Sequence, residues 1–213
     1  MPTVQNRLAV KRNLQDRIEQ AQKLEQTIDG SPITDLQIKP QAAQDIEKLV
    51  LALEQVSPFP NPLSYASQLL DGAWLLEYST AREIRSLKNL PLGFLVGEIY
   101  QTIDVASASF ENKAWVEHKS GLLGGYVRVT ASFAPACDRA SKQSLQKINV
   151  DFKQRYVGIT RILNWNTKLF DPIKVVAAQN PQGRIPSLDI TYIDETMRIG
   201  RGGDGSLFIL TRV

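Results

Sequence analysis

The sequence predicts a mainly β fold, an antiparallel barrel or sandwich, preceded by an arm of two α-helices. Three observations lead to this prediction. Apolar residues recur at helical spacing near the N-terminus, a cluster of prolines follows, and short segments of period-two alternation fill most of the remainder. With 43% hydrophobic and 22% charged residues, the chain of 213 residues is expected to fold around a sizeable core. Its longest apolar run, residues 90–96, is too short to cross a membrane as a helix.

Two amphipathic helices are expected before the β region. In the first, over about residues 3–29, apolar side chains fall three and four positions apart, and in the second, over 40–56, a proline occupies the first turn. Each helix has an apolar stripe that must be buried somewhere. The Pro-rich segment 57–62 excludes regular structure. We therefore divide the chain into a helical arm, residues 1–63, and a β-barrel domain, residues 64–213.

Nine candidate strands follow, each bounded by turn-forming residues. Little helix separates them, which favours antiparallel pairing. Two stretches fit no single element. Residues 84–97 combine a short helical pattern with an apolar loop, and residues 156–187 contain either a further strand near 174–178 or a functional flap. The nine candidates cover residues 74–78, 98–104, 107–111, 114–118, 125–133, 145–153, 188–194, 197–201 and 206–212.

The last three strands are expected to form a meander, and its two turns set the register. Gly203-Asp204 and Glu195-Thr196 are each interpreted as a two-residue hairpin loop. The sequence Gly200–Gly205 also matches the GxGxxG dinucleotide motif, but a strand rather than a helix follows it, so we interpret it as a turn. The predicted pairs are Arg201 with Ser206, Ile199 with Phe208, Met197 with Leu210, Tyr192 with Ile199, and Ile190 with Arg201.

One face of this predicted meander is apolar enough to line a core or a cavity. The opposite face is also rather apolar and needs partial cover. A slip of one residue would exchange the two faces. The first face carries Ile190, Tyr192, Met197, Ile199, Phe208 and Leu210, with Arg201 and Ser206 at one end, and the second carries Thr191, Ile193, Arg198, Gly200, Leu207 and Ile209.

Two arginines in this meander need partners if they are buried. Arg201 lies at the edge of the first apolar face, where a guanidinium requires an anion or several carbonyl groups. Its partner is expected to be Asp104 or Asp204, which would close the barrel end, or else the polar head of a ligand. Arg198, on the opposite face, is expected to be solvated or paired with Asp194.

Several chemistries are excluded by composition. A single histidine, His118, and a single cysteine, Cys137, remove most zinc sites, catalytic triads and any disulfide framework. The carboxylates of Asp194 and Glu195 are adjacent in a turn, so they diverge and form no acid/base dyad. The sequence therefore predicts no metal site and no enzymatic activity.

The net charge of +3 is unevenly distributed. Residues 1–71 hold 7 Lys and Arg against 9 Asp and Glu, and residues 72–213 hold 18 against 13. The basic β region is compatible with an anionic surface, but it lacks the clustered cations of a nucleic-acid groove, so no nucleic acid partner is expected. The N-terminal residues lack the apolar region of a signal peptide, which predicts an intracellular protein or one whose targeting peptide was removed.

Three ordered segments resemble signatures of the plastid lipid-associated protein family, also called PAP/fibrillins. Residues 70–80 (LDGAWLLEYST) resemble its opening signature, residues 97–104 (GEIYQTID) its middle block, and residues 191–210 its closing one. Gly200 stands where the family pattern has serine. The resemblance spans about residues 70–213 and leaves the two helices outside it.

This resemblance implies a lipocalin-like antiparallel β-barrel of about eight to ten strands. It implies binding of a hydrophobic small molecule at photosynthetic membranes, such as an isoprenoid quinone, a carotenoid, a chlorophyll derivative or an acyl lipid. We expect a cyanobacterial member, cytoplasmic and peripheral on the thylakoid membrane. A plant member would lie in the plastid stroma or in plastoglobules. No cofactor beyond such a bound isoprenoid, carotenoid or lipid is expected, and the oligomeric state is left open.

The predicted ligand-binding residues are mostly large apolar side chains of the alternating strands, which either line a hollow barrel or fill it. The apolar loop is expected to form a lip or a membrane contact through Leu92, Phe94 and Leu95. The ligand-binding set is Tyr126, Val129, Phe133, Val150, Phe152, Ile190, Tyr192, Ile199, Arg201 and Phe208.

A second hypothesis is a filled barrel whose helical arm docks on a photosynthetic or isoprenoid-synthesising complex. An interior void well above the volume of one water favours the carrier hypothesis. An arm packed over Ile193, Leu207 and Ile209 would remove the main support of the docking hypothesis.

Overall fold

The computed structural model describes residues 4–25, 30–87, 90–137, 143–163, 165–178, 180 and 183–213. Its helices are α1 (Val4–Leu24), α2 (Pro40–Glu54), α3 (Pro62–Tyr65), η1 (Ser67–Leu70), α4 (Arg82–Ser86) and η3 (Pro91–Gly93). Its strands are β1 (Ile33–Thr34), β2 (Gly72–Ser79), β3 (Phe94–Asp104), β4 (Ser109–His118), β5 (Leu123–Cys137), β6 (Gln143–Ile162), β7 (Trp165–Ala177), β8 (Ser187–Ile193), β9 (Met197–Gly202) and β10 (Leu207–Arg212).

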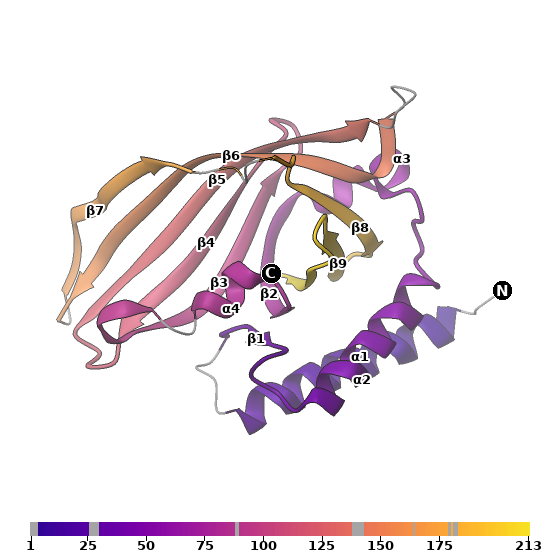
Figure 1. Ribbon diagram of the computed structural model, residues 1–213, viewed down its shortest axis with the longest axis horizontal. Coiled ribbons are helices and arrows are strands. Elements are labelled where there is room, and N and C mark those ends of the chain that lie inside the picture. Colours follow the sequence, from indigo (N-terminus) through magenta and orange to yellow (C-terminus); the bar gives the residue numbers. More distant parts are fainter. Residues whose placement is uncertain are drawn as a thin grey trace.

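The strands form one antiparallel sheet that closes into a barrel (Figure 1). Neighbours follow the order β2-β10-β9-β8-β6-β5-β4-β3, and β3 pairs again with β2 to complete the ring. The short β1 runs parallel to β2, and β7 pairs with the second half of β6. The long strands β4 to β7 extend well beyond the barrel, on the left of Figure 1.

The prediction of a mainly β fold with an antiparallel barrel is confirmed. Two predicted strands, 107–111 and 114–118, are one continuous strand, β4. The two polar residues between them, Asn112 and Lys113, pair with β3 and β5 instead of forming a turn. The unassigned stretch 156–187 contains the end of β6 and all of β7, so a strand does cover most of 174–178. The loop expected within residues 84–97 ends early, since β3 already begins at Phe94.

The predicted register of β9 and β10 is wrong by one residue. Their turn is a three-residue loop in which Gly205 has a positive φ of 83° and Gly202 N–H donates to the Ser206 carbonyl at 2.7 Å. This geometry is typical of a hairpin with a glycine bulge. Arg201 therefore faces Leu207 instead of Ser206. The shift turns Phe208 and Leu210 away from the face that carries Ile199.

A second irregularity lies in β8. The predicted loop at Glu195-Thr196 is confirmed in its pairing of Tyr192 with Ile199, but the register shifts between Ile190 and Tyr192, so Ile190 faces Gly200 rather than Arg201. Such a bulge reverses the faces of the residues beyond it. The inner face of the three strands consequently carries Ile190, Ile193, Arg198, Gly200, Phe208 and Leu210.

The outer face of β8 to β10 is covered by the two long helices, which lie side by side below β8 and β9 in Figure 1. The apolar stripes of α1 and α2 form a single buried cluster with the outer residues of these strands. Leu207 and Ile209 are covered in this way, whereas Ile193 packs in the interior cluster. The cluster contains Leu14, Ile18, Ala21, Ile33, Ile46, Val50, Leu53, Tyr78, Tyr192, Met197, Ile199, Leu207 and Ile209.

The docking hypothesis loses its main support, because the helices already bury their apolar faces against the barrel. The predicted boundary between a helical arm and a barrel domain at residue 63 stays a prediction.

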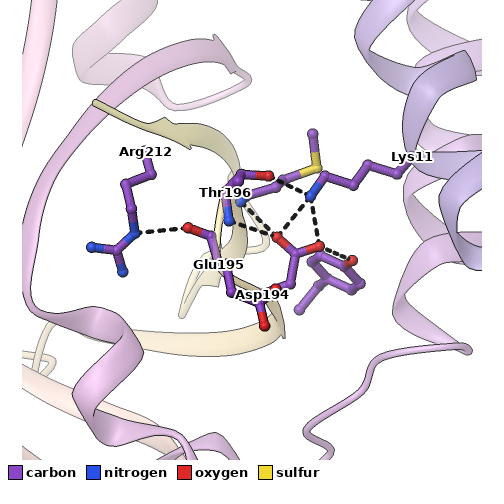
Figure 2. A network of polar contacts seen from close by, with 7 residues as sticks. Lys11, Asp194, Glu195, Thr196 and Arg212 are labelled. Carbon is purple, nitrogen blue, oxygen red and sulfur yellow. Dashed lines mark hydrogen bonds and ion pairs between the residues drawn. The ribbon is translucent and has the colours of Figure 1, made fainter.

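A buried ion pair anchors α1 to the turn between β8 and β9 (Figure 2). Lys11 Nζ lies 2.6 Å from Asp194 Oδ2 and also donates to the Thr196 hydroxyl at 2.6 Å. The carboxylate accepts further hydrogen bonds from the Tyr192 hydroxyl and from the backbone N–H groups of Thr196 and Met197. Burial alone would raise the pKa of Asp194, but these hydrogen bonds outweigh it and hold the pKa below its ordinary value of 3.8.

None of the helices in the described part of the chain is both long enough and apolar enough to cross a membrane.

Removing the Asp194 charge should destabilise the protein strongly. Asp194→Asn leaves the Lys11 ammonium buried without its counter-charge, which costs about 3–5 kcal/mol of unfolding free energy. Because the folded-state pKa of Asp194 is lowered, the wild-type contribution is present above pH 3.8 and is lost as pH falls through the folded pKa. Urea unfolding at pH 7 measures the loss, and a series toward acid pH measures its titration.

The matched control is Glu19→Gln, which breaks the exposed pair between Glu19 and Lys23 on the same helix. It should change stability by less than about 1 kcal/mol. Equal losses for the two substitutions would contradict the anchoring role of Asp194.

Candidate functional site

The barrel encloses a cavity of about 340 Å³. This is roughly ten times the ~30 Å³ that one water occupies in the liquid. By the criterion set from the sequence, a void of this size favours a ligand carrier over a filled barrel. Its walls are mostly apolar and come from strands β2, β3, β4, β6, β8 and β10: Leu76, Ile99, Phe110, Val150, Phe152, Leu188, Phe208 and Leu210.

Period-two alternation and one glycine shape the inside of the barrel. In β3, Ile99, Gln101 and Ile103 point to the same face, and the first two line the cavity. Gly200 in β9 contributes no side chain, and a Cβ there would lie 3.1 Å from Leu188 Cδ1. A larger residue at position 200 would therefore displace a wall residue or reduce the cavity.

The barrel is closed at one end by Trp74 and Arg212. The fully buried Trp74 indole donates to the Leu70 carbonyl at 2.9 Å, and the Arg212 guanidinium lies 4.4 Å from the ring centroid. Arg212 also donates to the carbonyls of Leu69 and Asp71 around η1, and to that of Glu195 (Figure 2). These contacts join η1, β2, β10 and the β8–β9 turn into a floor.

The rim of the cavity is polar and reaches the surface. It is built by α4, by the segment before β8 and by the β9–β10 turn. Arg184 and Asp204 lie at this rim 3.8 Å apart, and their side chains are 55% and 39% exposed. A ligand would therefore enter between Arg184, Asp204 and the α4 residues Glu83 and Ile84.

A polar stripe crosses the otherwise apolar interior. Arg198 donates to the Gln101 side-chain carbonyl, and Gln101 donates in turn to the Asn112 side-chain carbonyl at 2.8 Å. Arg198 is only 3% exposed, and its guanidinium lies 5.1 Å from the Trp74 ring centroid. Burial and the neighbouring Arg212 lower the pKa of Arg198 to about 9, which leaves it charged at neutral pH.

The predicted ligand-binding residues fall into two groups. Three of them, Val150, Phe152 and Phe208, line the cavity. Ile190 and Phe133 belong to the same interior cluster without lining the cavity. Val129 pairs with the cavity residue Asn112, so it shares that face of the sheet farther along β5.

Four predicted residues lie on the outside of the barrel, and their expected inward orientation is wrong. Tyr192 and Ile199 pack beneath α1 and α2, because the three-residue β9–β10 loop and the bulge in β8 shift the register of the meander. Tyr126 pairs with Trp115 on the outer side of β4 and β5, and its hydroxyl donates to Asp171 of β7. Arg201 is the fourth.

Arg201 binds two glutamates of α2 rather than Asp104, Asp204 or a ligand. Its Nε lies 2.8 Å from Glu54 Oε1, and its Nη2 lies 2.7 Å from Glu47 Oε1. The expectation of a barrel-closing pair is therefore replaced by a second anchor between the helices and the barrel. Arg198, expected to be solvated or paired with Asp194, is instead buried inside the barrel.

The predicted lip is only partly a loop. Leu92 lies in η3 and is 82% exposed, as a lip or membrane contact requires. Phe94 and Leu95 are half-buried in β3, where they pair with His118 and Glu117. The Phe94 ring packs edge-on against His118, with centroids 5.5 Å apart. A membrane contact by these residues remains a prediction.

Sequence reasoning missed the polar stripe of Arg198, Gln101 and Asn112. A signal for two of its members was present, since Gln101 alternates with Ile99 and Ile103 and Asn112 alternates between Phe110 and Ala114. For Arg198 there was none, because the face it occupies depends on the β9–β10 loop and on the bulge in β8.

Within the ranges that the structure describes, no group of three or more His, Cys, Asp or Glu side chains could hold a metal ion.

Comparison with known proteins gives one family and several plant relatives. A family model described as PAP_fibrillin matches residues 18–211. Plastid-lipid-associated protein 6, chloroplastic, of Arabidopsis thaliana is 29% identical over an alignment of 178 positions that covers 78% of this chain and 61% of the relative. The chromoplast-specific carotenoid-associated protein of Cucumis sativus is 29% identical over an alignment of 205 positions that covers 83% of this chain and 62% of the relative.

A further relative, plastid lipid-associated protein 1, chloroplastic, of Brassica campestris, is 27% identical over an alignment of 233 positions, gaps included, that covers 91% of this chain and 68% of the relative. The chain thus spans about three-fifths of the length of the first two relatives. The family match starts inside α1 and includes α2, so the expectation that both helices lie outside the resemblance is wrong.

Proposed function

The chain belongs to the PAP/fibrillin family, and from that premise we propose that it carries a hydrophobic small molecule inside its barrel at a photosynthetic membrane. The role is non-catalytic: the protein binds, shields and releases its ligand. The observation that carries this proposal is the apolar cavity of about 340 Å³. Family relatives named for plastid lipids and for carotenoid association support the class of ligand.

The dimensions of the cavity bear on how the ligand sits. It lies at the lower end of the ~300–1,000 Å³ typical of small-molecule sites. It would take up one chain or one ring system of an isoprenoid quinone, a carotenoid, a chlorophyll derivative or an acyl lipid. The remainder of a longer molecule would leave through the rim beside Arg184 and Asp204.

Filling the cavity should abolish binding without unfolding the protein. Leu188→Trp places an indole into the space bounded by Phe152 and Phe208. We expect at least a tenfold loss of affinity for a fluorescent polyene fatty acid, cis-parinaric acid, measured by titration, because the added ring occupies the ligand volume. The unfolding free energy should fall by no more than about 1–3 kcal/mol.

The control for this variant is Leu145→Trp, the same change at a strand position that is 46% exposed. It should bind the probe like the wild type. The proposal would fail if the wild type binds no probe and an organic extract of the protein from its source contains no stoichiometric pigment or lipid.

The surface for a membrane contact is proposed at one end of the long strands. Four exposed apolar residues belong to this end: one on η3, one on the β4–β5 turn, one on the β6–β7 turn and one at the start of β7. These elements lie far from α1 and α2 in Figure 1. Leu92 and Trp165 are 82% and 79% exposed, and Leu122 and Leu163 are 48% and 54% exposed. Leu92 and Leu163 have positive φ values of 61° and 55°, which leucine rarely adopts and which are often kept for function.

Charging this end of the sheet should release the protein from membranes. The double variant Leu92→Glu with Trp165→Glu removes two exposed apolar anchors, each worth about 1.5–3 kcal/mol when fully buried. Co-sedimentation with vesicles of phosphatidylglycerol and a neutral galactolipid should show at least a tenfold weaker association.

The control double variant, Tyr65→Glu with Val213→Glu, adds the same charge at two other exposed sites. It should sediment with vesicles like the wild type. Loss of association in both variants would show a general charge effect and would reject this surface.

A further inference from the structure

We propose that Arg198 selects a ligand with a carboxylate head, which it binds at the inner end of the barrel cavity while the apolar tail points to the rim. The inference rests on the proposed carrier function and adds the chemical class of the ligand. It starts from a charge that the protein itself does not neutralise.

Arg198 is a buried cation without an anionic partner in the described part of the chain. It is 3% exposed, and every ion pair seen there involves other residues. Its neighbours are the Gln101 amide, the Trp74 ring and a second cation, Arg212, which acts on it unfavourably. Buried charges in proteins are normally paired, because removing a charge from water is costly. Arg201, in the same strand, differs in this respect, because two glutamates balance its charge.

The guanidinium is also held ready for a ligand. Gln101 accepts one of its hydrogen bonds and is itself fixed by donating to Asn112, so the side chain is oriented across the floor of the cavity. A guanidinium carries five N–H donors, and a single acceptor on Gln101 leaves others available toward the cavity. Arg198, Gln101 and Asn112 all belong to the cavity lining, so a bound head group would meet them together.

A carboxylate fits this arrangement better than a neutral head. A neutral carbonyl or hydroxyl could accept a hydrogen bond but would leave the net positive charge of Arg198 and Arg212 unbalanced. A carboxylate accepts two parallel N–H bonds from one guanidinium and supplies the missing charge. The walls between the stripe and the rim, such as Val150, Phe152 and Phe208, are apolar and suit an alkyl or isoprenoid tail.

The test compares three ligands that share one tail: hexadecanoate, its methyl ester and hexadecanol. Each is titrated below its aggregation limit by displacement of methyl cis-parinarate, a fluorescent probe that has no carboxylate of its own. The wild type should bind the acid at least about tenfold more tightly than the ester or the alcohol, as expected for a charge-assisted hydrogen bond. In Arg198→Met, which keeps an unbranched apolar stem but removes the guanidinium, this preference should vanish while binding of the ester changes by less than about twofold.

Arg12→Met, at an exposed position of α1 outside the cavity lining, is the matched control and should keep the preference for the acid. Arg198→Met should also melt at the same or a higher temperature than the wild type, since it removes an uncompensated buried charge. If that variant does not fold, the comparison of acid with ester on the wild type decides alone. Equal binding of the acid and the ester by the wild type would overturn the role of Arg198 and leave the carrier function standing. Binding of none of the three would overturn both.

Discussion

The cover that α1 and α2 place over the outer face of β8, β9 and β10 is the contact on which the rest of the structure depends. Both faces of this meander are apolar, so one of them must be shielded by something other than the barrel interior. The helices supply that shield, and two charged contacts fix their position. Lys11 binds Asp194 at the β8–β9 turn, and Arg201 binds Glu47 and Glu54 of α2.

This arrangement separates stability from binding. Most of the best-buried side chains of the C-terminal strands, including Tyr192, Met197 and Ile199, pack between sheet and helices rather than inside the barrel. Because that second core contributes hydrophobic burial of its own, the barrel does not have to be filled to be stable. The interior can then keep a cavity, a glycine at position 200 and a guanidinium that no described carboxylate pairs with, none of which favours folding.

The sequence allowed the class of fold, the two helices, most strands and the family to be predicted, because each depends on local periodicity or on short signatures. It did not allow the register of the final meander to be predicted. The loop at Gly203 has three residues instead of two, and β8 contains a bulge after Ile190. Where one face of a strand is polar, the pattern itself reveals such a shift. Here both faces are apolar, so alternation of Tyr192 or Phe208 with its neighbours could not identify the inner one.

The positions of Arg198 and Arg201 show how that single-residue uncertainty changes the functional interpretation. They are three residues apart in one strand and therefore occupy opposite faces. With the predicted register, Arg201 would be the inner charge and Arg198 the solvated one. With the observed register, Arg201 satisfies its charge on two helix carboxylates, and its presence is explained by helix docking. Arg198 faces inward, and among the residues that the structure describes its polar partner is the Gln101 amide and no carboxylate forms an ion pair with it. Arg201, which stabilises the fold, has its counter-charges within the fold. Arg198 has no such counter-charge among the described residues, and it is therefore the arginine that indicates what the cavity binds.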